Sequence, residues 1–177
     1  MVRPPGGGFG RGPRGGGGND GRGRWNLSLT HTIQLTDTVL VTPGGPVLNL
    51  LDGDAITSGG VARHSFQLDG GGFYRGLGLR MSASYTGGSR VDGTTASLRF
   101  APIAKVNLRL FADLGRIPGL ADKTPFLKNA RLSLAVDNLF DGHQRVTDAN
   151  GVVPLRYQPG YIDPAGRVFK LEFRKQF

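Results

Sequence analysis

Apolar and polar side chains alternate through residues 24–41, RWNLSLTHTIQLTDTVLV, and the same pattern recurs in later segments. Successive side chains of a β-strand point to opposite faces of a sheet, so this period of two predicts strand and argues against helix. The segment is about 18 residues long, whereas strands of globular proteins usually have ~5–6 residues. The chain is therefore constrained to long strands that have one apolar and one polar face.

Five later segments share the alternation, which brings the predicted number of strands to six. They cover residues 63–74, 76–87, 95–115, 130–140 and 168–177. Within 95–115, Pro102 has no N–H to donate to a neighbouring strand, so we expect an exposed or bulged point there. No helix of substantial length is predicted, although residues 46–55 could form a turn or two within a loop.

If neighbouring strands are antiparallel, the connections between them lie at two opposite ends of the sheet. Residues 42–62, 88–93 and 141–165 would lie at one end of the sheet. A tight turn near Arg75 and residues 116–129 would lie at the other. An alternative divides residues 95–115 into a hairpin at the Ala-Pro-Ile sequence.

The two faces of the predicted strands suggest different surroundings. One face consists almost entirely of Leu, Val, Phe, Ala and Met, and the chain offers neither helices nor a second sheet to cover it. The other face carries Asn, Gln, Thr, Ser, Arg, Lys and Asp, which is too polar for the core of a sandwich. We therefore expect an all-β fold, an antiparallel portion of a transmembrane β-barrel with lipid outside and a watery lumen inside.

Six strands are too few to close such a barrel, since the smallest known have about eight. The opening MVRPPGGGFG also lacks the apolar segment of an export signal. We therefore expect the chain to be part of something larger. Two regions are expected, a flexible Gly/Arg-rich segment at 1–23 and barrel strands at 24–177.

A resemblance to a known family begins at LSLAVDNLFDGHQRV, residues 132–146. The sequence there resembles TonB-dependent outer-membrane receptors, whose penultimate strand commonly ends in an Asn-Leu-Phe-Asp box. That box is here Asn138, Leu139, Phe140 and Asp141. The family then has Pro-Gly-Arg before a last strand that ends in Phe. This chain has Gly166 and Arg167 in that place, with Ala165 inserted after Pro164, and it ends in Phe177.

The resemblance implies a 22-stranded barrel in the Gram-negative outer membrane, filled by an N-terminal plug. Such receptors take up a scarce ligand, such as a siderophore, with energy from the TonB complex. The chain would supply the C-terminal strands, with no plug domain of its own. Its partners would be outer-membrane lipid, the remaining barrel and plug, and TonB only through the missing N-terminal part. The terminal strand would act as a signal to the barrel-assembly machinery through Phe169, Leu171, Phe173 and Phe177.

Catalysis is not predicted, nor is any cofactor or metal. The three histidines, His31, His64 and His143, are far apart in sequence, and LLDGDA at 50–55 has only part of a calcium-loop pattern. The net charge of +9 and the Arg-Gly-rich first segment leave one alternative open. That alternative is a soluble β protein that binds nucleic acid through this segment, and it is not favoured because no known RNA-binding unit follows.

Charged and aromatic side chains give two further expectations for the barrel. Basic residues on the polar face could attract an anionic ligand, although we prefer pairing with carboxylates of a plug. These residues are Arg80, Lys105, Arg109, Lys170 and Arg174. Trp25, Tyr85 and the terminal phenylalanines are expected at the membrane interfaces.

Overall fold

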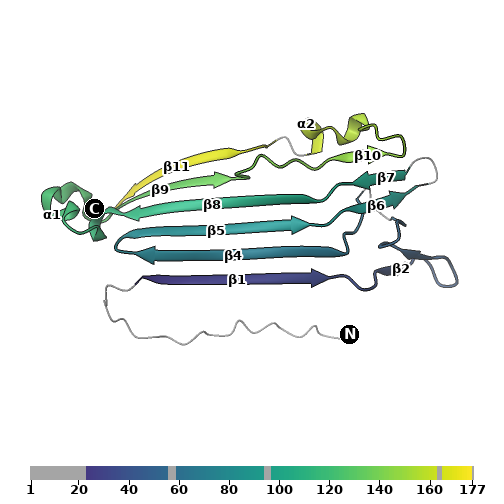
Figure 1. The fold of residues 1–177 in the computed structure, drawn as a ribbon, viewed down its shortest axis with the longest axis horizontal. Coiled ribbons are helices and arrows are strands. Elements are labelled where there is room, and N and C mark those ends of the chain that lie inside the picture. Colours follow the sequence, from purple (N-terminus) through teal and green to yellow (C-terminus); the bar gives the residue numbers. More distant parts are fainter. Residues whose placement is uncertain (1–22, 56–58, 94–96, 163–164, 177) are drawn as a thin grey trace.

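A six-stranded antiparallel sheet dominates the computed structural model, which describes residues 23–55, 59–93, 97–162 and 165–176. Each strand pairs with the next long strand along the chain, so the sheet is a simple meander (Figure 1). In spatial order the strands are β1 (Arg24–Ile33), β4 (His64–Tyr74), β5 (Leu77–Thr86), β8 (Ile103–Asp113), β9 (Ala130–Asp137) and β11 (Val168–Lys175). The prediction of six antiparallel strands in an all-β fold is confirmed.

The first predicted strand is shorter than expected, because the chain changes partner after Ile33. Gln34 still donates its backbone N–H to Arg63, but Asp37 accepts from Leu50. The chain then forms a separate hairpin from β2 (Thr38–Leu40) and β3 (Val47–Asn49). Val39 and Val41 keep the parity of Ile33 and Leu35, so the pattern did not reveal the break. The helical turns considered for 46–55 are replaced by β3 and a hydrogen-bonded turn.

The β5–β8 hairpin extends further than the sequence predicted. Residues 88–93, expected to be a connection, contain β6 (Ser89–Asp92), which pairs with β7 (Ser97–Phe100). The register is unchanged across the interruption, since Thr86 pairs with Ile103 and Ser89 with Phe100. Pro102 thus interrupts one long hairpin, and the alternative hairpin at Ala-Pro-Ile is wrong. The third strand of this small sheet is β10 (Val146–Asp148).

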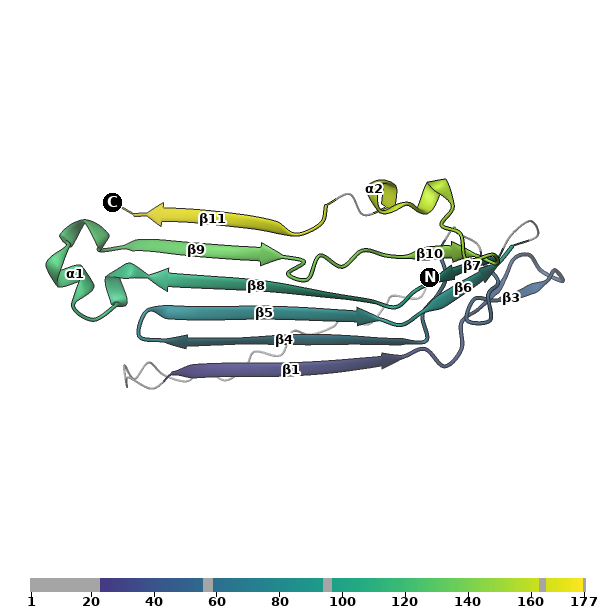
Figure 2. The same ribbon diagram turned by 45° about the horizontal axis from the view of Figure 1, so that its top comes forward.

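The connections fall at the two ends of the sheet as predicted (Figures 1 and 2). At one end β4 turns into β5 through Arg75 and Gly76, whose φ angles of 47° and 87° suit a two-residue hairpin. The same end holds the β8–β9 connection, with α1 (Leu120–Lys123) and the 3₁₀ turns Leu114–Arg116 and Pro125–Leu127. The opposite end holds the other three connections, including α2 (Pro159–Ile162) and the 3₁₀ turn Leu155–Tyr157. We call the end with Arg75 and Gly76 the short-turn end and the opposite one the long-connection end.

The described residues form one layer with very little interior. The buried apolar side chains among them are Ala130, Ala135, Val136 and Val146. Strands β1 and β11 are the two edges of the main sheet, which does not close on itself. In the described part of the chain, no helix combines the length and apolar character needed to cross a bilayer.

Candidate functional site

One face of the main sheet is apolar across all six strands. Residues that pair directly across neighbouring strands share a face, and the pairing Leu29–Leu68–Ala83–Val106 shows how the register aligns the apolar positions. Nothing in the described residues covers this face, so Trp25 is 81% and Leu171 is 75% exposed. The uncovered apolar surface is continuous, whereas soluble monomeric proteins usually expose apolar side chains singly or in small patches. We call it the apolar face.

Aromatic side chains lie toward both ends of the apolar face. Trp25 and Tyr74 lie near the short-turn end, whereas His31, Phe66 and Tyr85 lie near the long-connection end. The His31 ring stacks on Phe66 with centroids 4.0 Å apart. The positions between these groups are mainly aliphatic or glycine. The register thus places Trp25 and Tyr85, both expected at membrane interfaces, at opposite ends of one apolar band.

Two of the three histidines meet on this face although they are distant in sequence. His31 Nε2 lies 3.3 Å from His64 Nδ1, because β1 and β4 are neighbours. His143 lies elsewhere, in the connection after β9. No group of three or more His, Asp or Glu side chains in the described ranges could hold a metal ion. The two histidines form one group of neighbouring rings with Phe66 and Tyr85.

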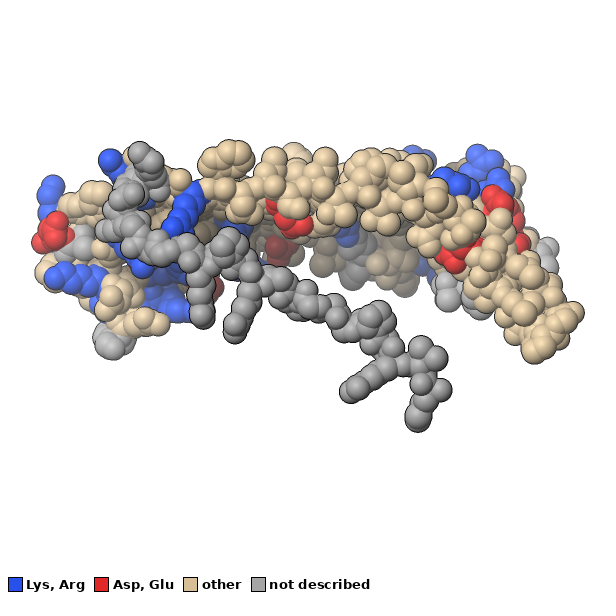
Figure 3. All heavy atoms as spheres, turned by 90° about the horizontal axis from the view of Figure 1, so that it is seen from below, with Lys and Arg blue, Asp and Glu red and all other residues tan. Residues whose placement is uncertain are grey.

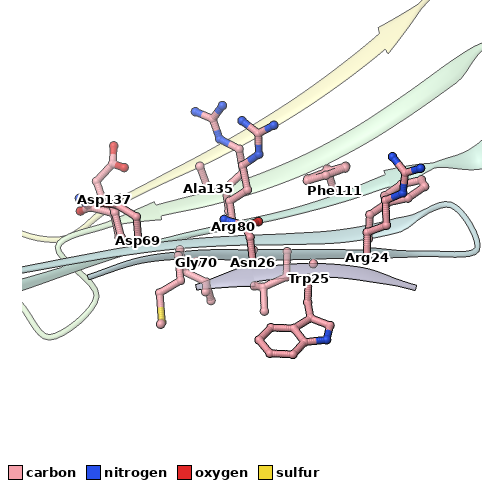
Figure 4. Close-up of a pocket in the computed structure, with 18 residues that line it drawn as sticks. Arg24, Trp25, Asn26, Asp69, Gly70, Arg80, Phe111, Ala135 and Asp137 are labelled. Carbon is pink, nitrogen blue, oxygen red and sulfur yellow. Dashed lines mark hydrogen bonds between the residues drawn. The ribbon is translucent and has the colours of Figure 1, made fainter. Parts of the chain in front are cut away.

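The opposite face is polar and hollowed. A groove of about 760 Å³ runs over β1, β4, β5, β8 and the end of β9. In Figure 4 the side chains of Arg80, Arg24 and Asp137 rise on one side of the sheet, whereas Trp25 points to the other. We call this surface the polar face. It holds all five basic residues that the sequence placed there: Arg80, Lys105, Arg109, Lys170 and Arg174.

Several charges on the polar face are matched within the chain. Lys170 Nζ lies 2.5 Å from Asp137 Oδ2, and Arg174 Nη2 donates to Glu172 Oε1 over 2.8 Å. Arg80 and Arg109, which pair directly across β5 and β8, have no such ion pair with a described residue. Figure 3 shows Lys and Arg gathered toward the ends of the molecule's long axis, with fewer charges between.

Two phenylalanines lie on the polar face against the general pattern. The Phe73 and Phe111 rings stack with centroids 6.1 Å apart, on either side of Gly78 in the intervening strand. A Cβ at Gly78 would lie 2.1 Å from Phe111 Cζ, so the aromatic contact requires glycine there. The Arg131 guanidinium lies 4.8 Å from the Phe111 ring centroid.

The Asn-Leu-Phe-Asp box forms a tight, hydrogen-bonded turn at the end of β9. Asn138 is 6% exposed and has a φ of 53°, a backbone conformation that asparagine tolerates better than most residues. Its side chain donates to the Gly142 carbonyl and accepts from the Gly142 N–H. Its own N–H donates to Asn107 Oδ1 on β8 over 2.9 Å. The turn is thereby fixed both to itself and to the neighbouring strand.

The same turn holds the segment that leads into β11. Asp141 Oδ1 accepts the Arg167 N–H over 2.8 Å. A Cβ at Gly166 would lie 2.4 Å from that carboxylate oxygen, so glycine allows the close approach. The structure therefore brings the box and Gly166–Arg167 together in space, a contact that the sequence patterns did not predict. Asn107 also has no local signal, since its role depends on the register of β8 with β9.

The other residues that the sequence singled out differ in burial and in the part of the sheet where they lie. Leu139 is half-buried and donates its N–H to Val106, whereas Phe140 is 73% exposed. Phe169, Leu171 and Phe173 all lie exposed on the apolar face of β11. Phe177 and the Gly/Arg-rich segment up to residue 22 lie outside the described residues.

Comparison with known proteins adds no relative. No protein-family model, no curated protein and no solved structure matches the chain. Functional inference therefore depends on the chemistry of the two faces and of the box.

Proposed function

We propose that residues 24–177 provide six adjacent strands of an outer-membrane β-barrel, with the apolar face toward lipid and the polar face toward the lumen. The observation that carries the proposal is the exposed apolar face itself. It is continuous over six strands and nothing in the described part of the chain covers it. In water this sheet would expose a large continuous apolar surface, which soluble monomeric proteins rarely do.

The dimensions of the sheet support this proposal. Strands β1 and β5 have 10 residues, β4 and β8 have 11, and β9 and β11 have 8. A tilted strand crosses the hydrocarbon with about 9–11 residues. Aromatic groups at both ends of an apolar band match the interfacial girdles of such barrels. The small sheet of β6, β7 and β10 would then stand beyond the membrane, above the long-connection end.

The open edges imply partners for β1 and β11. Unpaired backbone N–H and C=O groups are costly in hydrocarbon, so a membrane-spanning sheet must close. Closure needs strands from outside the described residues, in a longer protein or in further chains. Within this proposal, the partners are outer-membrane lipid, the rest of a barrel and the barrel-assembly machinery.

The more specific part of the proposal is a TonB-dependent receptor. The chain would be the C-terminal portion of its barrel, and the whole receptor would import a scarce ligand with energy from the TonB complex. The resemblance at Asn138–Asp141 and Gly166–Arg167 motivates this assignment. The Arg167 N–H donates to Asp141, so these two parts of the resemblance, which are separate in sequence, together hold the start of β11. This contact supports the assignment.

Flotation with lipid vesicles tests the membrane proposal. The full chain is diluted from urea into vesicles of outer-membrane lipids and centrifuged through a sucrose gradient. We expect it to float with the lipid, to resist a carbonate wash and to have a β-type circular dichroism spectrum. Recovery as a soluble, monomeric β protein would contradict the proposal. Salt-sensitive RNA binding by that soluble form would instead favour the nucleic-acid alternative.

A further inference from the structure

Among the described residues, three pairs of arginines face each other across neighbouring strands. They are Arg80 with Arg109, Arg131 with Arg174, and Arg90 with Arg99. Directly opposed side chains have Cβ atoms only about 4.5–5.5 Å apart, and like charges in this position destabilise a sheet. Each pair therefore needs a compensating group, and the three pairs differ in whether the described chain supplies one.

Two of the pairs are compensated within the chain. Arg90 Nε lies 3.2 Å from Asp92 Oδ2, and its Nη2 donates to the Asp52 carbonyl over 2.7 Å. In the second pair, Arg174 binds Glu172, while Arg131 lies over the Phe111 ring. In the first pair a carboxylate offsets one positive charge, and in the second a carboxylate and an aromatic ring contact one arginine each.

The Arg80–Arg109 pair has no such group among the residues that the structure describes. Three carboxylates line the groove and the hollow next to it, and each has another partner: Asp137 binds Lys170, Glu172 binds Arg174, and Asp69 accepts from the neutral amide of Gln67. None of the three forms an ion pair with Arg80 or Arg109. Arg80 and Arg109 also line a second hollow of about 180 Å³ next to the groove. Their guanidinium groups thus stand between two open spaces on the polar face.

We propose that Arg80 and Arg109 form a binding site for a small oxyanion, a phosphate or carboxylate group of a molecule that enters the groove. Guanidinium forks bind such groups through paired, charge-assisted hydrogen bonds. A doubly charged anion neutralises both arginines at once. The groove volume of about 760 Å³ lies in the range of small-molecule sites, and Asn107 and Arg24 add donors to its wall. The site does not depend on what covers the apolar face.

Thermal unfolding of the full chain in detergent micelles tests this site with inorganic phosphate and with citrate as separate probes. Sodium chloride keeps the ionic strength equal in every sample, so that general screening is constant. We expect a saturating probe to raise the Tm by about 4 °C or more. Whichever probe acts identifies the preferred group, phosphate or carboxylate. Isothermal calorimetry of the same samples measures the affinity directly.

Three variants separate the site from general charge effects. Arg80→Gln and Arg109→Gln should each weaken binding about tenfold or more, and each should raise the Tm without anion because repulsion is relieved. Arg99→Gln removes the same charge from a compensated pair and should bind the probe like the wild type. Equal responses in all four proteins, or no response to either probe, would overturn the proposal. A lower Tm of both groove variants without anion would also overturn it, because the pair would then be stabilising by itself.

Discussion

The two faces of the six-stranded sheet differ in how their side chains are satisfied. On the polar face, Lys170 binds Asp137, and Glu172 binds Arg174. On the apolar face, Leu171 is 75% and Leu27 is 62% exposed, and no described residues form a second layer above them. Water can solvate the polar face, including its unpaired arginines, but it solvates the leucines of the apolar face poorly. This difference indicates that the apolar face requires another medium, and lipid is the one we propose.

A charge placed on the apolar face should have the largest effect. Leu68 pairs with Leu29 and Ala83 in the middle of that face. In vesicles, Leu68→Arg should lower the free energy of unfolding by about 2–4 kcal/mol, the cost of arginine in the bilayer centre. Gln67→Arg, one residue away at an exposed position of the polar face, should change it by no more than about 0.5 kcal/mol. Urea titration measures both, and equal losses would contradict the distinction between the faces.

The next largest effect is expected at Asn138, where the pattern of faces ends. By alternation this position belongs to the apolar face, yet it holds a buried amide in a turn with φ of 53°. Asn138→Ala removes both side-chain bonds to Gly142 and disfavours that backbone, so a loss of about 2–3 kcal/mol is expected. The exposed Asn150→Ala serves as the control and should be nearly neutral. An equally small effect at Asn138 would mean that the turn does not need this residue.

Two glycines should respond with opposite signs. Gly78→Ala drives the Phe111 ring out of its stack with Phe73 and should cost about 1–2 kcal/mol. Gly72→Ala meets nothing closer than 3.5 Å, so its lower flexibility should stabilise the strand by about 0.5 kcal/mol. Urea unfolding in detergent micelles measures both changes. Stabilisation by both substitutions would show that the aromatic pair on the polar face is not firmly packed.

The smallest effect should come from an ion pair on the polar face. Lys170 and Asp137 have side chains that are 62% and 44% exposed. Lys170→Gln should therefore lower the free energy of unfolding by at most about 0.5 kcal/mol, and less at high salt. A loss of several kcal/mol, measured in the same way, would mean that the polar face is drier than a watery lumen allows.

Alternation of side chains was sufficient to predict the six strands, their antiparallel order and the ends at which their connections lie. It could not predict where a strand changes partner, because β2 continues the pattern of β1 while pairing with β3. It also missed β6, since Gly87 and Gly88 resemble a turn but lie within a hairpin of unbroken register.

The site was less predictable than the fold, because its contacts join distant residues. The bond between Asp141 and Arg167, the His31–His64 contact and the facing of Arg80 and Arg109 all depend on strand register. Alternation along the strands predicted that basic residues lie on the polar face. Only pairing across strands distinguishes the compensated arginine pairs from Arg80–Arg109.

Tryptophan fluorescence tests the central claim most directly, because Trp25 is the chain's single tryptophan. In a Trp25→Phe background, Leu29→Trp and Ser28→Trp place the probe on opposite faces of β1. Reconstituted in vesicles, the residue-29 probe should be quenched by acyl-chain quenchers and protected from aqueous iodide, and the residue-28 probe should behave in the reverse way. Equal access of iodide to both probes would contradict a lipid-facing apolar surface.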